Sequence, residues 1–363
     1  MPRLARFAIL MLALLTVASG CSKKSTSPLP AFEVRTFRMG FSAIPPRPEL
    51  SAVIATIDLM APRSDVALIF GEPPWDTLLA GVPAADYVAR ERKPLADYFR
   101  AKGMRVWVYL DPANGLDRSA ESALLVAAGR SITEPAIQSL YREYAAALDT
   151  LVRPDVFGVA VETNLIRALS PAPLYAAVRQ VAAATAAHVR ALDPSVRLSA
   201  SVQVETAWGR APLGPYQGAD TDFADFPFIE LLGLSSYPYF VWAAPESLPT
   251  NYYARLVEGR AIPVAMIEGG WTSESIAGVV STPDAQRRYI ARQGVLLDEA
   301  RAAAVFQLTF TDLQLSSFPP ADADGVRPFS RLGLVDSAFT PRPALSAWDA
   351  LHARPRAGGA GLP

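Results

Sequence analysis

The stretch Ile262-Pro263-Val264-Ala265-Met266-Ile267-Glu268-Gly269-Gly270-Trp271 decides the fold class. It begins as an apolar run with the length of a buried strand, then changes at once into a carboxylate, two glycines and a tryptophan. An ionised carboxylate in such a place costs free energy unless it is paired or used. The stretch Phe157-Gly158-Val159-Ala160-Val161-Glu162-Thr163-Asn164 has the same form. Two glutamates therefore stand at the ends of two predicted strands.

The bulk composition is that of a folded chain with a large core. Of its 363 residues, 51% are hydrophobic and 19% are charged, and these proportions exclude global disorder. The length suits one large domain or two ordinary ones. The net charge is -1 and no basic run is present, so we do not expect nucleic acid as a partner.

The N-terminus has the pattern of an export signal. Arg3 and Arg6 precede an apolar run from Phe7 to Ala18, which is too short to span a membrane. Small residues then lead into Cys21, the only cysteine, so an intramolecular disulfide is impossible. The segment resembles the lipobox of bacterial lipoproteins. That resemblance implies a signal peptide over residues 1–20 and a lipid on the sulfur of Cys21.

A lipid on Cys21 implies an anchor in a membrane of the bacterial cell envelope. Residues 21–33, rich in Ser, Lys, Thr and Pro, then form a flexible tether to an exported domain. No Asp follows Cys21, which favours the outer membrane or cell surface of a Gram-negative source. The alternative is an ordinary secretory signal with an incidental cysteine.

From residue 34 onward, short apolar runs alternate with amphipathic segments. The runs predict eight strands, at 36–42, 65–70, 105–110, 157–161, 197–204, 231–235, 262–267 and 303–308. We expect helices at 49–60, 84–102, 133–151, 173–192, 282–301 and 343–352. This alternation indicates a parallel sheet, and eight units fit a (β/α)8 barrel over residues 34–353, followed by a frayed tail over 354–363. An open doubly wound sheet is the alternative, but no Gly-rich phosphate loop follows the first strand.

The strand-end carboxylates indicate the chemistry. In a parallel barrel the ends of all strands lie on one face, so Glu162 and Glu268 can face each other there. Cleavage of a glycosidic bond uses such a pair, and a separation of about 5–5.5 Å predicts retention of configuration. Other carboxylates also follow predicted strands, and Glu205 is the rival catalytic candidate; the rest are Glu72, Asp111 and Asp312.

Three segments resemble the retaining β-glycosidases of glycoside hydrolase clan A. Ile267-Glu268-Gly269-Gly270-Trp271 looks like their nucleophile strand, and Leu234-Ser235-Ser236-Tyr237-Pro238-Tyr239 looks like strand six of the endo-β-1,4-galactanase and related families. Gly333-Leu334-Val335-Asp336 resembles the usual exit into the last helix. The resemblance implies that Glu162 is the acid/base, Glu268 the nucleophile and Tyr237 a partner of Glu268.

The chain departs from the clan at two positions. Val161 stands directly before Glu162, where the clan normally has an Asn that binds the sugar 2-hydroxyl, and Asn164 comes two places after the glutamate. Phe310 stands near the place where a tryptophan often supports the sugar. These departures favour the alternative of a saccharide-binding surface lipoprotein without catalysis. A further alternative is an envelope scaffold with a vestigial cleft, in which the strand-end aromatic side chains are buried.

Aromatic residues follow several predicted strands. Sugar rings stack their C–H faces on such side chains. We therefore expect substrate contacts from aromatic residues and one amide: Trp75, Trp208, Tyr237, Trp271 and Asn164. Trp242 and Tyr239 lie in similar loops, whereas Trp107 and Trp348 are predicted to be core residues.

The residues that are missing narrow the chemistry further. The only histidines, His188 and His352, fall in predicted helices, so neither a Ser-His-Asp triad nor a His-rich metal site can be assembled. We expect no cofactor and no metal. The sequence thus predicts a monomeric, lipid-anchored, retaining β-glycosidase-like hydrolase that acts on an extracellular or envelope β-linked saccharide.

Overall fold

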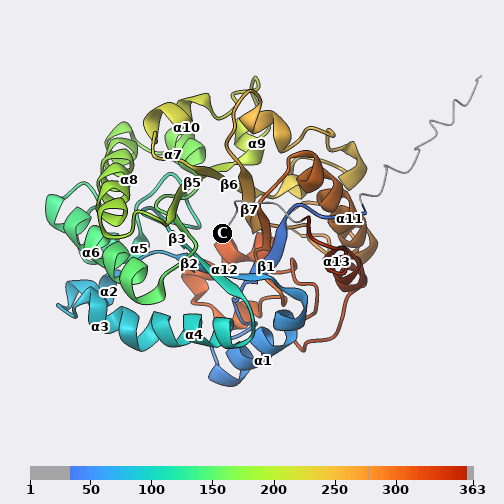
Figure 1. The fold of residues 1–363 in the computed structure, drawn as a ribbon, viewed down its shortest axis with the longest axis horizontal. Coiled ribbons are helices and arrows are strands. Elements are labelled where there is room, and N and C mark those ends of the chain that lie inside the picture. Colours follow the sequence, from blue (N-terminus) through green and yellow to red (C-terminus); the bar gives the residue numbers. More distant parts are fainter. Residues whose placement is uncertain (1–32, 277, 358–363) are drawn as a thin grey trace, which may run out of the picture. The chain divides into compact units, whose positions relative to one another are not determined.

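The computed structural model describes residues 33–357, apart from residue 277. Eight parallel strands pair in chain order and close on themselves, with β1 bonded to β8 (Figure 1). The predicted (β/α)8 barrel is confirmed. The strands are β1 (Arg38–Ser42), β2 (Val66–Gly71), β3 (Arg105–Leu110), β4 (Val156–Gly158), β5 (Arg197–Gln203), β6 (Leu231–Ser236), β7 (Val264–Gly269) and β8 (Ala304–Gln307).

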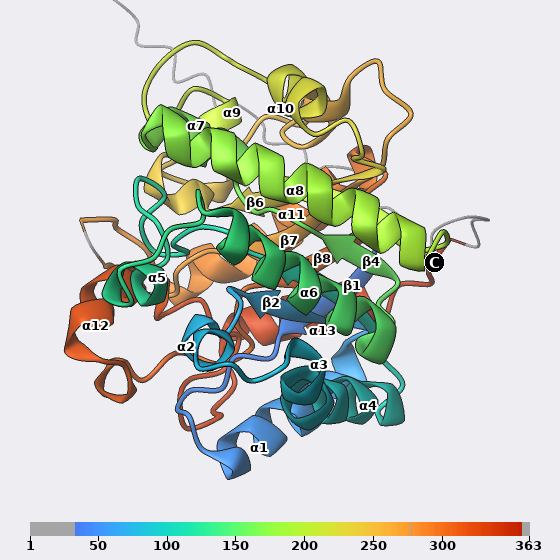
Figure 2. The same cartoon turned by 90° about the vertical axis from the view of Figure 1, so that its left-hand side faces the viewer.

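Helices surround the barrel and cover the outer side of its strands (Figures 1 and 2). The long helices α6 and α8 pack side by side on this outer layer. The helices are α1 (Leu50–Met60), α2 (Trp75–Leu79), α3 (Ala84–Tyr87), α4 (Lys93–Ala101), α5 (Ala123–Ala127), α6 (Pro135–Val152), α7 (Thr163–Leu169), α8 (Ala172–Leu192), α9 (Val204–Ala207), α10 (Asp220–Asp225), α11 (Pro283–Glu299), α12 (Pro320–Val326) and α13 (Pro343–His352).

Two predicted elements differ from the structure by more than two residues at an end or by a break in the element. The helix expected at 84–102 is divided by a π-helical turn over Val88–Arg92, in which the Lys93 amide donates to the Val88 carbonyl. Pro94 follows at once, and proline has no amide hydrogen with which to continue an α-helical pattern. The strand expected at 157–161 ends at Gly158, although the chain still bonds to β5 through Val159 N and Ala160 O.

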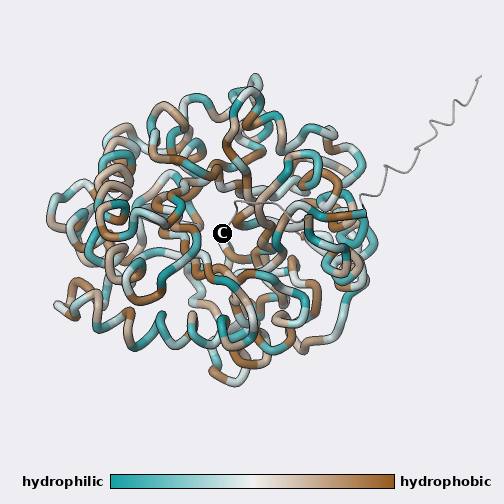
Figure 3. Tube along the Cα trace, viewed as in Figure 1, coloured by the Kyte–Doolittle hydropathy of each residue, from teal (hydrophilic) through white to brown (hydrophobic). Residues whose placement is uncertain are grey.

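Aromatic side chains fill the inside of the barrel. Trp107 and Phe306 pack there with ring centroids 5.3 Å apart, and Trp107 is buried as predicted. The ring of Tyr109 lies over Gly158, where an added Cβ would meet the ring at 2.0 Å. Hydrophobic residues also gather along the strands around the centre (Figure 3). The interior is therefore a packed core, as in other barrels of this type.

A β-bulge sets the direction of Glu268. Leu234 pairs with Met266, but the next residue, Ser235, pairs with Glu268, so Ile267 is an extra residue on β7. Bulges of this kind re-aim a side chain next to an active site. The following Gly269 has a φ of +150°, and a Cβ there would meet the Ser236 carbonyl oxygen at 2.3 Å. The glycine after the glutamate is thus required by the backbone.

The two ends of the described chain lie against each other. Arg35 N donates to the Pro355 carbonyl at 2.9 Å, and Ala357 N donates to the Arg35 carbonyl at 2.8 Å. The first residues of the predicted tail, 354–357, are thus hydrogen-bonded to the barrel. The predicted signal peptide and Cys21 lie outside the described residues. Among the helices that are described, none is long and apolar enough to cross a membrane.

We predict that Gly158→Ala destabilises the barrel by about 1–3 kcal/mol, because the new methyl group collides with the ring of Tyr109. Urea unfolding measures this change. Gly214→Ala is the matched control, since a Cβ at Gly214 meets nothing within 4 Å, and its effect should stay within about 0.5 kcal/mol. Equal effects of the two substitutions would contradict the packing described for Tyr109.

Candidate functional site

Glu162 and Glu268 both lie at the carboxyl end of the barrel, where the sequence placed them. Glu162 directly precedes α7 and has a left-handed backbone, with φ 49° and ψ 44°. Its amide donates to Ser201 Oγ at 2.9 Å, which ties this strained residue to β5. Such strain in a residue other than glycine persists only where the surroundings hold it, and it is common at active sites.

A single hydroxyl joins the two carboxylates. Ser235 Oγ lies 2.5 Å from Glu162 Oε1 and 2.7 Å from Glu268 Oε1. The two Oε1 atoms are therefore at most 5.2 Å apart (2.5 + 2.7 Å), because both contacts meet at one atom. All three residues are buried, with Glu162 6% and Glu268 5% exposed.

A buried arginine holds the other side of Glu162. Arg118 lies in the loop between β3 and α5, and its Nε donates to Glu162 Oε2 at 2.7 Å. One of its terminal nitrogens donates to Asp111 Oδ2 at 2.6 Å. Burial acts to lower the pKa of Arg118, but the charges of Asp111 and Glu162 outweigh burial and raise it. Arg118 is thus a permanent cation with charge-assisted hydrogen bonds to two carboxyl groups.

Within residues 33–357 as described, no Lys, Arg or His side chain forms an ion pair with Glu268. Burial first, and then the nearby charge of Glu162, raise the pKa of Glu268 to about 8. Tyr237, expected as its partner, packs its ring on Phe329 with centroids 4.8 Å apart. Burial and the charges of both glutamates raise the pKa of Tyr237. Tyr237 is therefore close to the pair, but its one hydrogen bond to a carboxylate runs from its amide to Glu205 at 3.1 Å.

Glu205, the rival candidate, is a separate buried carboxylate. It is fully buried, and it accepts hydrogen bonds from Tyr252 Oη at 2.6 Å, Ser236 Oγ at 2.8 Å and the side chain of Gln203. Burial raises its pKa, and these donors act against that shift. Neutral donors thus saturate Glu205, whereas Glu162 and Glu268 share a hydroxyl with each other.

The expected sugar-binding side chains have other contacts in this structure. Trp75 is 0% and Trp271 1% exposed; Trp75 faces Tyr141, and Trp271 Nε1 donates to Ser281 Oγ at 3.0 Å. Trp208 is half-buried, and its Nε1 donates to the Tyr252 carbonyl at 2.9 Å. The burial of Trp75 and Trp271 is the arrangement that the scaffold alternative expects.

Three further predicted positions have structural roles. Asn164 is bonded to the end of β5 by two hydrogen bonds. Its Nδ2 donates to the Gln203 carbonyl at 2.9 Å, and its Oδ1 accepts from the Gln203 amide at 2.7 Å. Val161 points into the apolar interior of the barrel. Phe310 is buried, with its ring 5.1 Å from that of Phe41.

The sequence reasoning missed Ser235 and Arg118. Ser235 lies in the segment predicted as the sixth strand, but serine is common in strands and no local pattern indicates that this one contacts a carboxylate. Arg118 lies in a loop where residues 115–117 and 119 are exposed, so no local pattern predicts its burial. Among the described residues, no group of three or more His, Cys, Asp or Glu side chains is placed to hold a metal ion.

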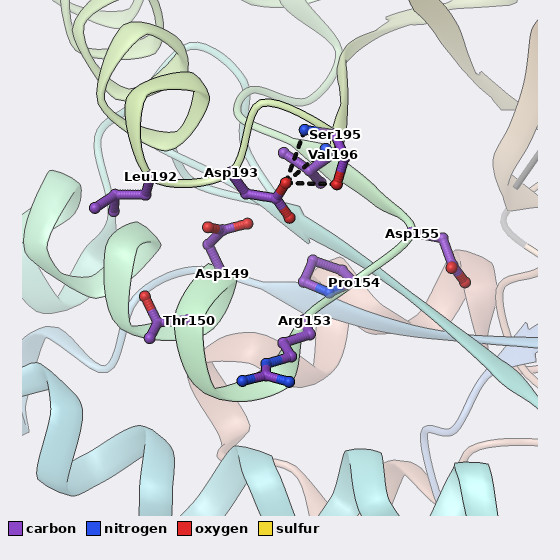
Figure 4. Close-up of a pocket in the computed structure, with 9 residues that line it drawn as sticks. All are labelled: Asp149, Thr150, Arg153, Pro154, Asp155, Leu192, Asp193, Ser195 and Val196. Atoms are coloured by element: carbon purple, nitrogen blue, oxygen red, sulfur yellow. Dashed lines mark hydrogen bonds between the residues drawn. The ribbon is translucent and has the colours of Figure 1, made fainter.

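A cavity of about 650 Å³ lies among the loops that lead into β4 and β5, at the opposite end of the strands from the glutamate pair (Figure 4). The cavity lies between the C-terminal ends of α6 and α8. Its lining includes Asp149 and Asp193. Asp149 is buried and its Oδ1 has no hydrogen-bond partner. Burial and the charge of Asp193 raise the pKa of Asp149 to about 6.

Comparisons by sequence find no relative: no protein-family model matches the chain, and no curated protein matches it. Solved structures do match. A GH5_18 protein from Streptomyces cattleya, in complex with GlcNAc, is similar with a TM-score of 0.62 and 18% identity over 91% of this chain and 83% of that one. The GH53 catalytic domain of Ignisphaera aggregans is similar with a TM-score of 0.58 and 14% identity. The match covers 80% of this chain and 87% of that one.

The chain shares the barrel fold of these solved structures. An exo-beta-1,4-mannosidase from an Opitutaceae bacterium, strain TAV5, is also similar, with a TM-score of 0.57 and 16% identity over 87% of this chain. This chain spans 59% of that enzyme's length. At these identities the likeness is one of fold, and function has to be argued from the site.

We predict that Asp149→Asn stabilises the protein only at higher pH. The pKa of Asp149 is raised above its unfolded value, so its ionisation destabilises the fold as the pH rises through about 4 to 6. The variant should match the parent below about pH 4 and exceed it by about 1–3 kcal/mol above about pH 6. Urea unfolding across this range measures the difference. Asp86→Asn, at an exposed position, is the control, and a pH-independent gain at Asp149 would contradict the assignment.

Proposed function

We propose that the chain is a retaining β-glycosidase-like hydrolase in which Glu162 and Glu268 form the catalytic pair. The observation that carries the proposal is the placement of these two carboxylates on one hydroxyl at the carboxyl end of the barrel. Active sites of enzymes with this fold lie at that end. The pair is buried, and burial is what separates the proton affinities of two catalytic carboxyls.

The chemistry needs one carboxyl to protonate the leaving oxygen while the other attacks the anomeric carbon. Water then releases the sugar, and the first residue acts as a base. Retaining enzymes place the two groups about 5–5.5 Å apart, and inverting enzymes about 6.5–9.5 Å apart. The separation of at most about 5 Å supports the retaining course.

We further propose a β-linked saccharide of the cell envelope or its surroundings as the substrate. One similar structure is that of an exo-beta-1,4-mannosidase, and another holds Manb1-4GlcNAc. β-Mannosides are therefore the first substrates to try. The lipobox-like segment ending in Cys21 supports attachment to a membrane of the envelope.

A saccharide-binding lipoprotein without catalysis is the second candidate. Two observations favour it: Arg118 occupies one face of Glu162, and Val161 stands in the apolar interior instead of an amide that could meet a sugar hydroxyl. In that case the buried pair would be a relic of the fold.

We predict that Glu162→Gln and Glu268→Gln each lower kcat by about 10²–10⁴-fold, because each removes one half of the carboxylate chemistry. The measurement is release of aryl alcohol or reducing sugar from a panel of β-glycosides, beginning with β-mannosides. Glu258→Gln, at an exposed position, is the control and should keep full activity.

Two other outcomes would change the proposal. Activity that survives both substitutions would move the chemistry elsewhere, with Glu205→Gln tested next. No hydrolysis by the parent, together with retention of one polysaccharide in a pull-down, would favour the binding lipoprotein.

A further inference from the structure

The Ser235 hydroxyl has fewer hydrogens than it has carboxylate neighbours. The hydroxyl carries one hydrogen, yet Oγ lies within hydrogen-bond distance of a carboxylate oxygen on both Glu162 and Glu268. Two ionised carboxylates have only acceptors to offer, so the hydroxyl can satisfy just one of them. The other contact is a hydrogen bond only if its carboxyl group is protonated and donates to Ser235 Oγ. With one proton on the pair, both contacts are ordinary two-centre hydrogen bonds.

The arrangement of charges decides which carboxyl holds that proton. Arg118 Nε donates to Glu162 at 2.7 Å, so Glu162 is the ionised member. Glu268 has no such donor; Glu162, Asp111, Arg118 and Tyr237 are the titratable groups that face it.

This resting arrangement is the reverse of what the reaction needs. The resemblance to clan A assigns the acid to Glu162 and the nucleophile to Glu268, so the proton has to change places before the sugar bond breaks. Arg118 prevents this while it bonds to Glu162. Arg118 is buried although its neighbours Leu116, Asp117 and Ser119 are exposed, so its side chain extends inward from an exposed part of the loop.

We propose that Ser235 relays the proton from Glu268 to Glu162 when substrate displaces Arg118 from Glu162. Glu268 donates its proton to Ser235 Oγ while the Ser235 hydroxyl gives its own to Glu162. One O–H bond breaks and one forms at each end, and the pair neither gains nor loses a proton. Glu268 becomes the carboxylate that attacks, and Glu162 becomes the acid.

Arg118 and Ser235 are thus positioning residues for the pair. While Arg118 bonds to Glu162, it favours the proton on Glu268. Withdrawal of Arg118 removes that preference, and Ser235 can then pass the proton to Glu162. The catalytic use of the relay rests on the proposed function. The position of the proton on Glu268 while Arg118 bonds to Glu162 is independent of that function.

Neutron diffraction from deuterated crystals of the protein without substrate tests the resting state near neutral pH. We expect deuterium on Glu268 Oε1 directed at Ser235 Oγ, and the Ser235 deuterium directed at Glu162 Oε1. Deuterium on Glu162, or on neither carboxyl, would overturn the proposal. This experiment needs no hydrolysis, so its failure is distinct from a failure of the proposed function.

Kinetics of Ser235→Ala and Ser235→Thr test the relay. On a dinitrophenyl glycoside, whose leaving group needs no acid, Ser235→Ala should lower kcat by about 10²-fold near neutral pH. Activity should return as the pH rises above about 8, where Glu268 loses its proton to solvent. Ser235→Thr keeps a hydroxyl and should keep most of the activity. Ser42→Ala, at a buried serine on β1 whose hydroxyl has no partner, is the control.

A merely structural role for Ser235 gives a different result. It would lower the activity of Ser235→Ala equally at every pH, or lower that of Ser235→Thr to the same extent. Either outcome would overturn the relay even if the protein hydrolyses glycosides.

Discussion

Closure of the parallel barrel is the constraint on which the rest of this structure depends. All neighbouring strands are parallel and β1 bonds to β8, so the strands form one ring and residues far apart in sequence meet at its carboxyl end. Glu162 and Glu268 are joined by a hydroxyl from β6, although 33 residues separate Ser235 from Glu268 and 73 separate it from Glu162. Closure also forces the interior to be filled, and Tyr109 fills it only because Gly158 leaves room.

The buried charges at that end impose the second constraint. Asp111, Glu162 and Glu268 are three buried carboxyl groups, and among the described residues Arg118 is the one cation that bonds to members of this group. One cation between Asp111 and Glu162 leaves Glu268 unpaired, so the site holds a proton instead. A single bonded cation among three buried carboxyl groups is therefore the physical basis of the proposed proton on Glu268. This is why the functional and the structural accounts of the site are inseparable.

Much of the barrel could be predicted from local patterns. The period and spacing of apolar runs predicted all eight strands, and β3 and α13 match their expected bounds. The Glu-Gly-Gly pattern marked the end of β7, since the backbone there requires glycine. Patterns of this kind are local, and so they fix which residues stand at strand ends. Local patterns failed where contacts between residues distant in sequence determine the structure. They predicted a longer strand than β4, which ends at Gly158, and they predicted accessible side chains for Trp75 and Trp271, which are buried.

The sequence by itself determined that two glutamates stand at the ends of strands four and seven of a parallel barrel, because hydrophobic periodicity and the alternation of strands with helices are written along the chain. Only the tertiary structure decided how those glutamates are used. The bulge at Ile267 turns Glu268 toward Ser235, and the loop after β3 brings Arg118 onto Glu162. Protonation depends on distances between groups that no sequence pattern links, and those distances exist only once the ring has closed.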